Sequence, residues 1–213
     1  MTDYINLPPD NFRNLTWIDE IVRLITPEEH WGNVMVAGGA FKHALTDRSE
    51  VKDLDVFFLN QNAFDSVVSW ATEEIGEPIY VNEKSTGFKT EGGVRLDVVQ
   101  TIFGTPEEIL DSFDFTVTQM ALTPLPATED GKETFRLICH PNFFEHLHMK
   151  RLVIETDDLP FPISTFERSY RYNRYGFGMC KDSRVRLLLQ LAAYQPSAIS
   201  ADALSQSLYD GMD

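Results

Sequence analysis

The chain has 213 residues and a formal net charge of −15, with 43% hydrophobic and 24% charged residues. This composition is typical of a folded globular protein, and the length suffices for one large domain or one domain with a small appendage. The negative charge repels phosphate backbones, so we expect no tight, sequence-independent binding to long nucleic acids. No apolar run reaches the roughly 20 residues that span a bilayer, and the N-terminus lacks a signal-peptide pattern. Because Cys139 and Cys180 are too few for a disulfide framework, we expect a cytoplasmic protein without membrane contact.

The first part of the chain alternates between helical and extended patterns. Residues 16–26 place Trp17, Ile18 and Val22 on one broad apolar face, which is typical of an amphipathic helix. Short apolar runs bounded by Gly, Asp and Asn clusters indicate strands. In chain order, the pattern predicts a helix over 16–26, a strand over 34–37, a helix over 40–45, a strand over 54–59, a helix over 63–74, and strands over 79–82, 87–90 and 94–101.

The second part begins with a short helix over residues 105–110, for which Thr105 is the expected N-cap and Pro106 the first-turn residue. The remaining expected elements are two strands of a long-loop hairpin over 116–122 and 134–138, a helix that ends at Met149, and helices over 164–175, 183–193 and 201–209. We therefore expect an α+β fold with two parts. Residues 1–155 would form a catalytic domain with a mixed β-sheet flanked by helices, and residues 156–213 a small helical C-terminal unit.

The most informative residues are a glycine pair and the carboxylate pair that follows it. Gly38 and Gly39 come directly after the expected strand 34–37, where a backbone without side chains can approach a phosphate closely. Asp53 and Asp55 open the next apolar run, and residues i and i+2 of a strand point to one face, roughly 6.5 Å apart. Carboxylates at that spacing can share hard cations such as Mg²⁺. The combination is typical of a site that handles a nucleoside triphosphate.

A third carboxylate, Asp97, lies in the later apolar run that begins at Arg95. If the strand that carries Asp97 is next to the strand that carries Asp53 and Asp55, the three carboxylates close a triangle. Asp97 can then hold the metal ion that activates an acceptor hydroxyl. The alternative is that all three are solvated carboxylates on strands, and that the glycines form an ordinary turn.

Four segments in this order resemble the signature of the polymerase-β-like nucleotidyltransferase superfamily, and most of all the head of the CCA-adding enzyme and bacterial poly(A) polymerase. The segments are residues 36–45, 52–56, 113–122 and 168–177. The ordered set is far more specific than the glycine pair or the Asp-x-Asp pair alone.

The resemblance implies a metal-dependent transfer of an NMP from an NTP to a hydroxyl group, with release of pyrophosphate and with Mg²⁺ or Mn²⁺ as the cofactor. By position, Gly38 and Gly39 would hold the triphosphate. Asp53, Asp55 and Asp97 would bind the metals and carry the catalysis.

Other residues are further candidates for nucleotide binding. Asp114 matches the third segment of the resemblance, but it could also cap the residues that follow it. Arg168 and Arg171 lie on one stripe of the expected helix 164–175, where they could contact a phosphate or form surface ion pairs. Lys42 follows the glycines and could contact the triphosphate or be a plain surface lysine.

The chain departs from the family at positions that bear on the acceptor. The family carries paired arginines where Ser112 and Phe113 stand, and its base-reading element would fall near Phe161, Pro162 and Thr165. Base preference is therefore open. The resemblance favours an RNA 3′ end, such as that of a tRNA, as acceptor. The alternatives are NMP transfer to a protein or a small molecule, or a catalytically silent nucleotide-binding regulatory protein on the same fold.

Overall fold

The computed structural model describes residues 2–47, 51–128, 131 and 134–193, and the chain divides into two compact units. Unit 1 comprises Met1–Phe113 and Thr118–Phe143, and unit 2 comprises Asp114–Val117 and Phe144–Asp213. The helix expected over residues 201–209 lies outside the described residues. The expected domain boundary near residue 155 stays a prediction.

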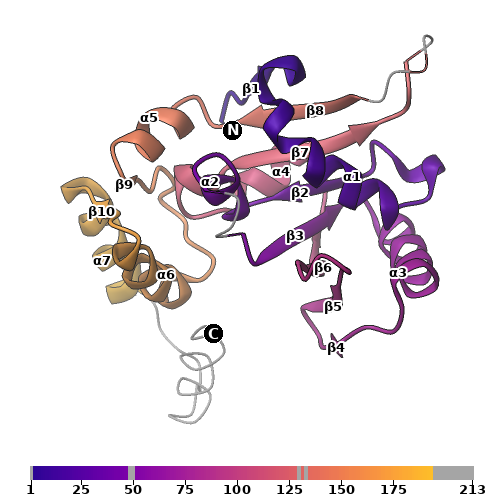
Figure 1. The fold of residues 1–213 in the computed structure, drawn as a ribbon. Helices are drawn as coiled ribbons and strands as arrows, with labels where there is room; N and C mark the ends of the chain where they lie inside the picture. Colours follow the sequence, from indigo (N-terminus) through magenta and orange to yellow (C-terminus); the bar gives the residue numbers. More distant parts are fainter. Residues whose placement is uncertain (1, 48–50, 129–130, 132–133, 194–213) are drawn as a thin grey trace. The chain divides into compact units, whose positions relative to one another are not determined.

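Unit 1 is built on an eight-stranded mixed sheet in the order β1-β8-β7-β2-β3-β6-β5-β4 (Figure 1). Its strands are β1 (Ile5–Leu7), β2 (Val34–Ala37), β3 (Asp53–Phe58), β4 (Tyr80–Val81), β5 (Ser85–Lys89), β6 (Arg95–Phe103), β7 (Met120–Leu125) and β8 (Thr134–Cys139). Within the described part of the sheet only β3 and β6 pair in parallel, and all other neighbours are antiparallel. The expected mixed sheet is confirmed, and the first five predicted strands correspond to β2 to β6. Strand β1 was not predicted, because three residues carry too little pattern.

The strand predicted over residues 116–122 is wrong in its first half. Thr116–Thr118 forms a single 3₁₀ turn, and β7 begins only at Met120. The Thr116 backbone N–H donates to the Val153 carbonyl over 3.1 Å, and its hydroxyl lies 2.7 Å from His146 Nδ1. These bonds tie Thr116 to unit 2, and its backbone is therefore not available to the sheet of unit 1.

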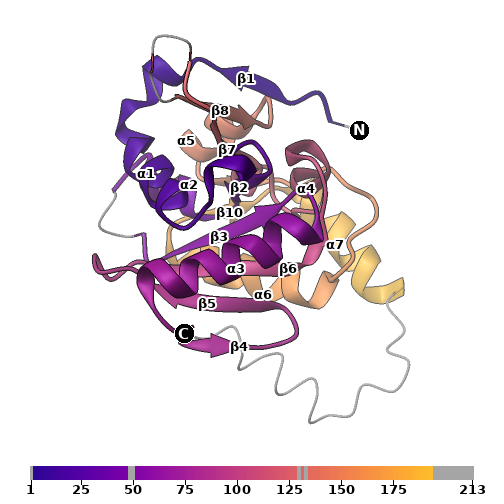
Figure 2. The same cartoon turned by 90° about the vertical axis from the view of Figure 1, so that its right-hand side faces the viewer.

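The helices of unit 1 pack on both faces of the sheet. They are α1 (Thr16–Leu24), α2 (Ala40–Ala44), α3 (Gln61–Ile75) and α4 (Pro106–Asp111). On one face, Ile109 and Leu110 of α4 pack with Met35, Ala37 and Phe57 of the sheet. On the other, Phe64 of α3 meets Phe58 edge to face at 5.5 Å, and Figure 2 shows α3 running along β3 and β6. No helix in the described ranges is long and apolar enough to cross a membrane.

The cap predicted for the helix after residue 104 is confirmed. The hydroxyl of Thr105 accepts a hydrogen bond from the Glu108 backbone N–H, and the Glu108 carboxylate accepts one from the Thr105 N–H, so the two residues form a capping box. This cap fixes the start of α4, which carries two of the core residues of its face of the sheet.

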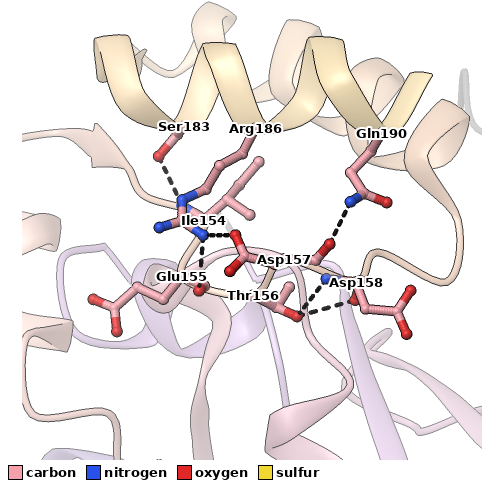
Figure 3. A network of polar contacts seen from close by, with 8 residues as sticks. All are labelled: Ile154, Glu155, Thr156, Asp157, Asp158, Ser183, Arg186 and Gln190. Atoms are coloured by element: carbon pink, nitrogen blue, oxygen red, sulfur yellow. Dashed lines mark hydrogen bonds and ion pairs between the residues drawn. The ribbon is translucent and has the colours of Figure 1, made fainter. Parts of the chain in front are cut away.

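The C-terminal elements are α5 (Phe143–His148), β9 (Arg151–Leu152), α6 (Pro162–Arg174), β10 (Gly178–Met179) and α7 (Lys181–Ala193). In unit 2 the ring of Tyr172 lies 5.8 Å from that of Phe115 and 6.0 Å from that of Phe177. The segment 154–158 is held against α7 by polar contacts (Figure 3). Ser183 accepts the Ile154 N–H over 2.9 Å, and further contacts of the segment with α7 join Arg186 to Asp157 and Gln190 to the Asp157 carbonyl.

Candidate functional site

The register of two strands places all three predicted aspartates on one face of the sheet. Asp53 and Asp55 are two residues apart in β3, so both side chains point to the same face. In the parallel pair of β3 and β6, Asp55 lies opposite Asp97, and Asp53 lies opposite Arg95. Neighbouring strands are about 4.8 Å apart, and the carboxylates of Asp55 and Asp97 therefore start from adjacent positions.

The aspartates lie where the apolar core of their face ends. Asp55 precedes Phe57 by two residues and pairs with Ala37 on its other side, and both of these neighbours belong to that core. Exposure changes from one carboxylate to the next: the side chain of Asp53 is 48% exposed and that of Asp97 is 15% exposed. The site is thus open at Asp53 and more enclosed at Asp97.

A guanidinium group joins two of the three carboxylates. Arg95 Nη2 lies 2.8 Å from Asp53 Oδ2, and Arg95 Nε lies 3.1 Å from Asp97 Oδ1. Burial alone would lower the pKa of Arg95, but attraction to Asp97 and Asp53 outweighs it and raises the pKa above its usual value. Arg95 therefore keeps its positive charge within the carboxylate cluster formed by Asp53, Asp55 and Asp97.

A tyrosine from the edge of the sheet reaches Asp97 across an intervening glycine. The Tyr80 hydroxyl donates to Asp97 Oδ1 over 2.6 Å. Tyr80 pairs with Gly87, and Gly87 pairs with Asp97, so the three residues form one row across β4, β5 and β6. A Cβ on Gly87 would stand 2.1 Å from the Tyr80 ring, which means that only glycine lets the ring lie flat over β5. Burial and the hydrogen bond to the Asp97 carboxylate raise the pKa of Tyr80.

The glycine turn lies beside Asp55. Gly38 has a φ of +101°, a conformation that favours glycine, and a Cβ there would meet the Phe113 ring at 3.3 Å and Asp55 Oδ2 at 3.6 Å. The Gly38 N–H donates to the Met120 carbonyl over 3.2 Å. What Gly38 contributes to the site is therefore space next to Asp55, and its N–H is already engaged.

Lys42 and Gly39 complete this corner of unit 1. Gly39 is the N-cap residue of α2. The Lys42 side chain folds back so that Nζ donates to the Gly39 carbonyl over 3.1 Å, and the residue is only 7% exposed. The alternative of a plain surface lysine is therefore wrong, because the ammonium group is directed at the turn.

The other predicted nucleotide-binding residues belong to unit 2. Asp114 Oδ2 and Arg168 Nε lie 3.0 Å apart as an ion pair, with side chains 5% and 38% exposed. Arg171 lies on the same helix, α6, and is exposed. The structure thus pairs Asp114 with Arg168, and it brings Asp53, Asp55 and Asp97 together with Gly38 in unit 1.

The three carboxylates have the chemistry that a divalent cation requires. They supply the oxygen ligands that Mg²⁺ and Mn²⁺ prefer, and they lie at adjacent positions on one face. However, Arg95 joins Asp53 to Asp97, and no three acidic, histidine or cysteine side chains among the described residues converge into a metal-holding group. The three carboxylates fit the cation in kind and share one face of the sheet, but the Arg95 guanidinium contacts two of them and would have to leave for a cation to bind.

Four residues of this site were not predicted from the sequence: Tyr80, Gly87, Arg95 and Phe113. Arg95 could have been found, because its spacing of two from Asp97 places both on one face of a strand. The roles of Tyr80 and Gly87 depend on the register of three strands. Phe113, which meets Phe57 edge to face at 5.8 Å and lies over Gly38, follows a helix. No local pattern reveals these contacts.

Comparisons with solved structures identify the fold. The chain is similar to a CCA-adding enzyme in complex with CTP, with a TM-score of 0.68 and 17% identity over 99% of this chain and 50% of that chain. The same enzyme type in complex with ATP gives a TM-score of 0.64 and 17% identity over 99% and 51% of the two chains. The Thermotoga maritima CCA-adding enzyme in complex with tRNA gives 0.61 and 16% identity over 91% and 47%. The chain thus spans about half the length of these enzymes.

Sequence comparisons identify the family. No curated protein sequence matches the chain significantly. The model of the Gabija anti-defense 2 family matches residues 11–150, a range that contains seven of the eight strands of the sheet, β2 to β8, and the three aspartates. The expected nucleotidyltransferase head is confirmed as the fold, and the chain belongs to the Gabija anti-defense 2 family.

Proposed function

We propose that this protein is a metal-dependent nucleotidyltransferase that moves an NMP from an NTP to a hydroxyl group and releases pyrophosphate. One observation carries the proposal: Asp55 and Asp97 lie opposite each other on parallel neighbouring strands, with Asp53 on the same face and the Gly38 turn alongside. The similarity of the fold to CCA-adding enzymes in complex with CTP and ATP supports it.

Each residue of the site has a proposed role. Asp53, Asp55 and Asp97 hold Mg²⁺ or Mn²⁺, which when bound neutralises phosphate charge and activates the attacking hydroxyl. Gly38 keeps the turn free of a side chain for a triphosphate to approach, because a Cβ there would stand 3.3 Å from the Phe113 ring and 3.6 Å from Asp55 Oδ2. The Lys42 ammonium braces the turn through the Gly39 carbonyl and adds positive charge close to the phosphates.

We propose an RNA 3′ end as the acceptor. The fold similarity includes an enzyme in complex with tRNA, and the exposed Arg171 of α6 offers a donor for a backbone phosphate. The net charge of −15 limits the contact with RNA to a short end rather than a long duplex.

A hydroxyl on a protein is the second candidate acceptor. The same net charge favours a compact or basic partner over nucleic acid, and the family is described by an action against a defense system. In this case the chemistry at the three aspartates is unchanged, and only the acceptor differs.

The test is a transfer assay with each of the four α-labelled NTPs, Mg²⁺ or Mn²⁺, and a cell extract that supplies RNA and protein. We expect label in a macromolecular product, and treatment with nuclease or protease then identifies the acceptor. Asp55→Asn should lower transfer by at least about 100-fold. Asp65→Asn is the matched control, because Asp65 is exposed on α3 at the opposite face of the sheet.

Three results would reject parts of the proposal. Equal transfer by the wild type and Asp55→Asn would remove the assignment of the site. Protease-sensitive label would replace RNA by a protein acceptor. If the wild type binds NTP but transfers nothing to either fraction, the protein is a silent nucleotide-binding protein on this fold.

A further inference from the structure

Arg95 forms ion pairs with two of the three aspartates of the candidate site. Its guanidinium contacts Asp53 and Asp97 at once, at 2.8 Å and 3.1 Å, on the face that carries the carboxylate cluster. We propose that Arg95 is the internal counter-ion of this cluster, and that a divalent cation displaces its guanidinium upon binding. The inference rests on the proposed function, since it takes Asp53, Asp55 and Asp97 as the cation ligands.

The first step of the argument is the charge of the cluster without a cation. Like charges directly opposite each other on neighbouring strands are destabilising. Asp55 lies opposite Asp97, and Asp53 lies two residues before Asp55 on the same face. Arg95, opposite Asp53 and two residues from Asp97, is the side chain whose register brings a positive charge to this repulsion. A planar guanidinium can hold two carboxylates in fixed directions, which a lysine ammonium cannot do as well.

The second step is competition for the same oxygen atoms. Arg95 contacts Asp53 Oδ2 and Asp97 Oδ1, and Asp97 Oδ1 also accepts the Tyr80 hydroxyl. A Mg²⁺ ion needs carboxylate oxygens at about 2.1 Å and repels any cation that shares them. An ion held jointly by Asp53 and Asp97 therefore takes the place of the Arg95 nitrogens.

The third step is the ease with which Arg95 can leave. Its side chain is 44% exposed, and so is about as open to water as the Asp53 carboxylate at 48%. Ion pairs at such exposure contribute little to stability, because water and salt screen them. Arg95 can therefore rotate into solvent while the strand that carries it stays in place.

The chain provides a matched control on the neighbouring strand. Lys89 of β5 pairs with Arg95, so it lies in the same row of the sheet one strand farther from Asp53, and it is exposed. Lys89→Gln removes the same charge from the same face as Arg95→Gln. A difference between the two variants then reports the direct contacts of Arg95 rather than the general charge of the surface.

The test is titration of the full chain with Mn²⁺ in the absence of nucleotide, followed by calorimetry and by the Mn²⁺ spin-resonance signal. We expect Arg95→Gln to bind Mn²⁺ about tenfold more tightly than the wild type, because a competing cation is gone. Arg95→Lys should stay within about threefold of the wild type, and Lys89→Gln within about twofold. Mn²⁺ should also raise the melting temperature of Arg95→Gln by more than that of the wild type.

Each other outcome has a defined meaning. Equal or weaker Mn²⁺ affinity in Arg95→Gln, in protein whose circular dichroism matches the wild type, overturns the inference but leaves the proposed transferase intact. An equal gain in Arg95→Gln and Lys89→Gln also overturns it, because surface charge would then suffice. If neither the wild type nor Arg95→Gln binds Mn²⁺, the inference falls together with the metal dependence of the proposed function.

Discussion

Gly87→Ala should destabilise the protein only while the ring of Tyr80 is present. The new Cβ would lie 2.1 Å from the Tyr80 ring, about 1.3 Å short of ordinary van der Waals contact. The ring must move, and the 2.6 Å hydrogen bond from its hydroxyl to Asp97 breaks with it. Because β4 is a two-residue strand at the end of the strand order, the ring can shift, and the overpacking stays near the lower end of its range, about 1 kcal/mol. Loss of a partly exposed hydrogen bond to a carboxylate adds about 1 kcal/mol.

The sign should reverse in the Tyr80→Ala background. Gly87 has no left-handed φ, so an alanine adopts its backbone without strain and reduces the entropy of the unfolded chain, which stabilises by about 0.4–1 kcal/mol. The wild type, Gly87→Ala, Tyr80→Ala and the double variant should thus show a coupling of at least about 2 kcal/mol. Urea denaturation of the four proteins measures it. Effects that add within about 0.5 kcal/mol would refute the reasoning.

Three further predictions concern the turn, a buried thiol and the ion pair of unit 2. Gly38→Ala should lower the free energy of unfolding by about 2 kcal/mol, because its φ of +101° is strained for any other residue; removal of the nearby ring by Phe113→Ala should not restore it, as thermal denaturation of both variants will show. Burial raises the pKa of Cys139 from 9.0 to about 12, so between these pH values the unfolded chain has lost a proton that the folded chain keeps, and stability falls as the pH rises. Relative to Cys139→Ala, the wild type should lose about 1.4 kcal/mol per pH unit in denaturation curves above pH 9, and parallel curves for the two proteins would contradict this. Asp114→Asn should cost about 1–2 kcal/mol because it leaves the partly exposed Arg168 guanidinium without its charge partner; in the Arg168→Gln background the same change should have little effect, and a full effect there would show that Asp114 acts through other contacts.

Local patterns in the sequence were sufficient to predict the central strands and their acidic residues. The strand predicted over residues 34–37 is β2 with the same bounds, and the apolar runs that contain Asp55 and Asp97 became β3 and β6. These strands are almost wholly buried on one face, so their hydrophobicity is a direct signal of burial. The N-cap at Thr105 was predicted for an equally local reason, since its partner Glu108 is three residues away.

Long-range register limited the rest of the prediction. That Asp55 lies opposite Asp97 could only be stated as a condition, because the two residues are far apart in the chain and no local pattern sets their alignment. Tyr80 reaches Asp97 only because Gly87 stands between them in the row, which requires two further pairings. The turn at Thr116 was missed because its partners Val153 and His146 lie in a later part of the chain.

The four residues 114–117 affect how this protein can be divided and recombined. Their companions in unit 2 come from residues 144 onward, and Phe115 is fully buried, with the ring of Tyr172 at 5.8 Å. A single cut therefore cannot separate the units cleanly: a fragment that stops at Phe143 keeps Phe115 without its aromatic neighbour. Chimeras between relatives should exchange residues 114–117 and the C-terminal part as one block. Substitutions in these two stretches should also occur together among relatives.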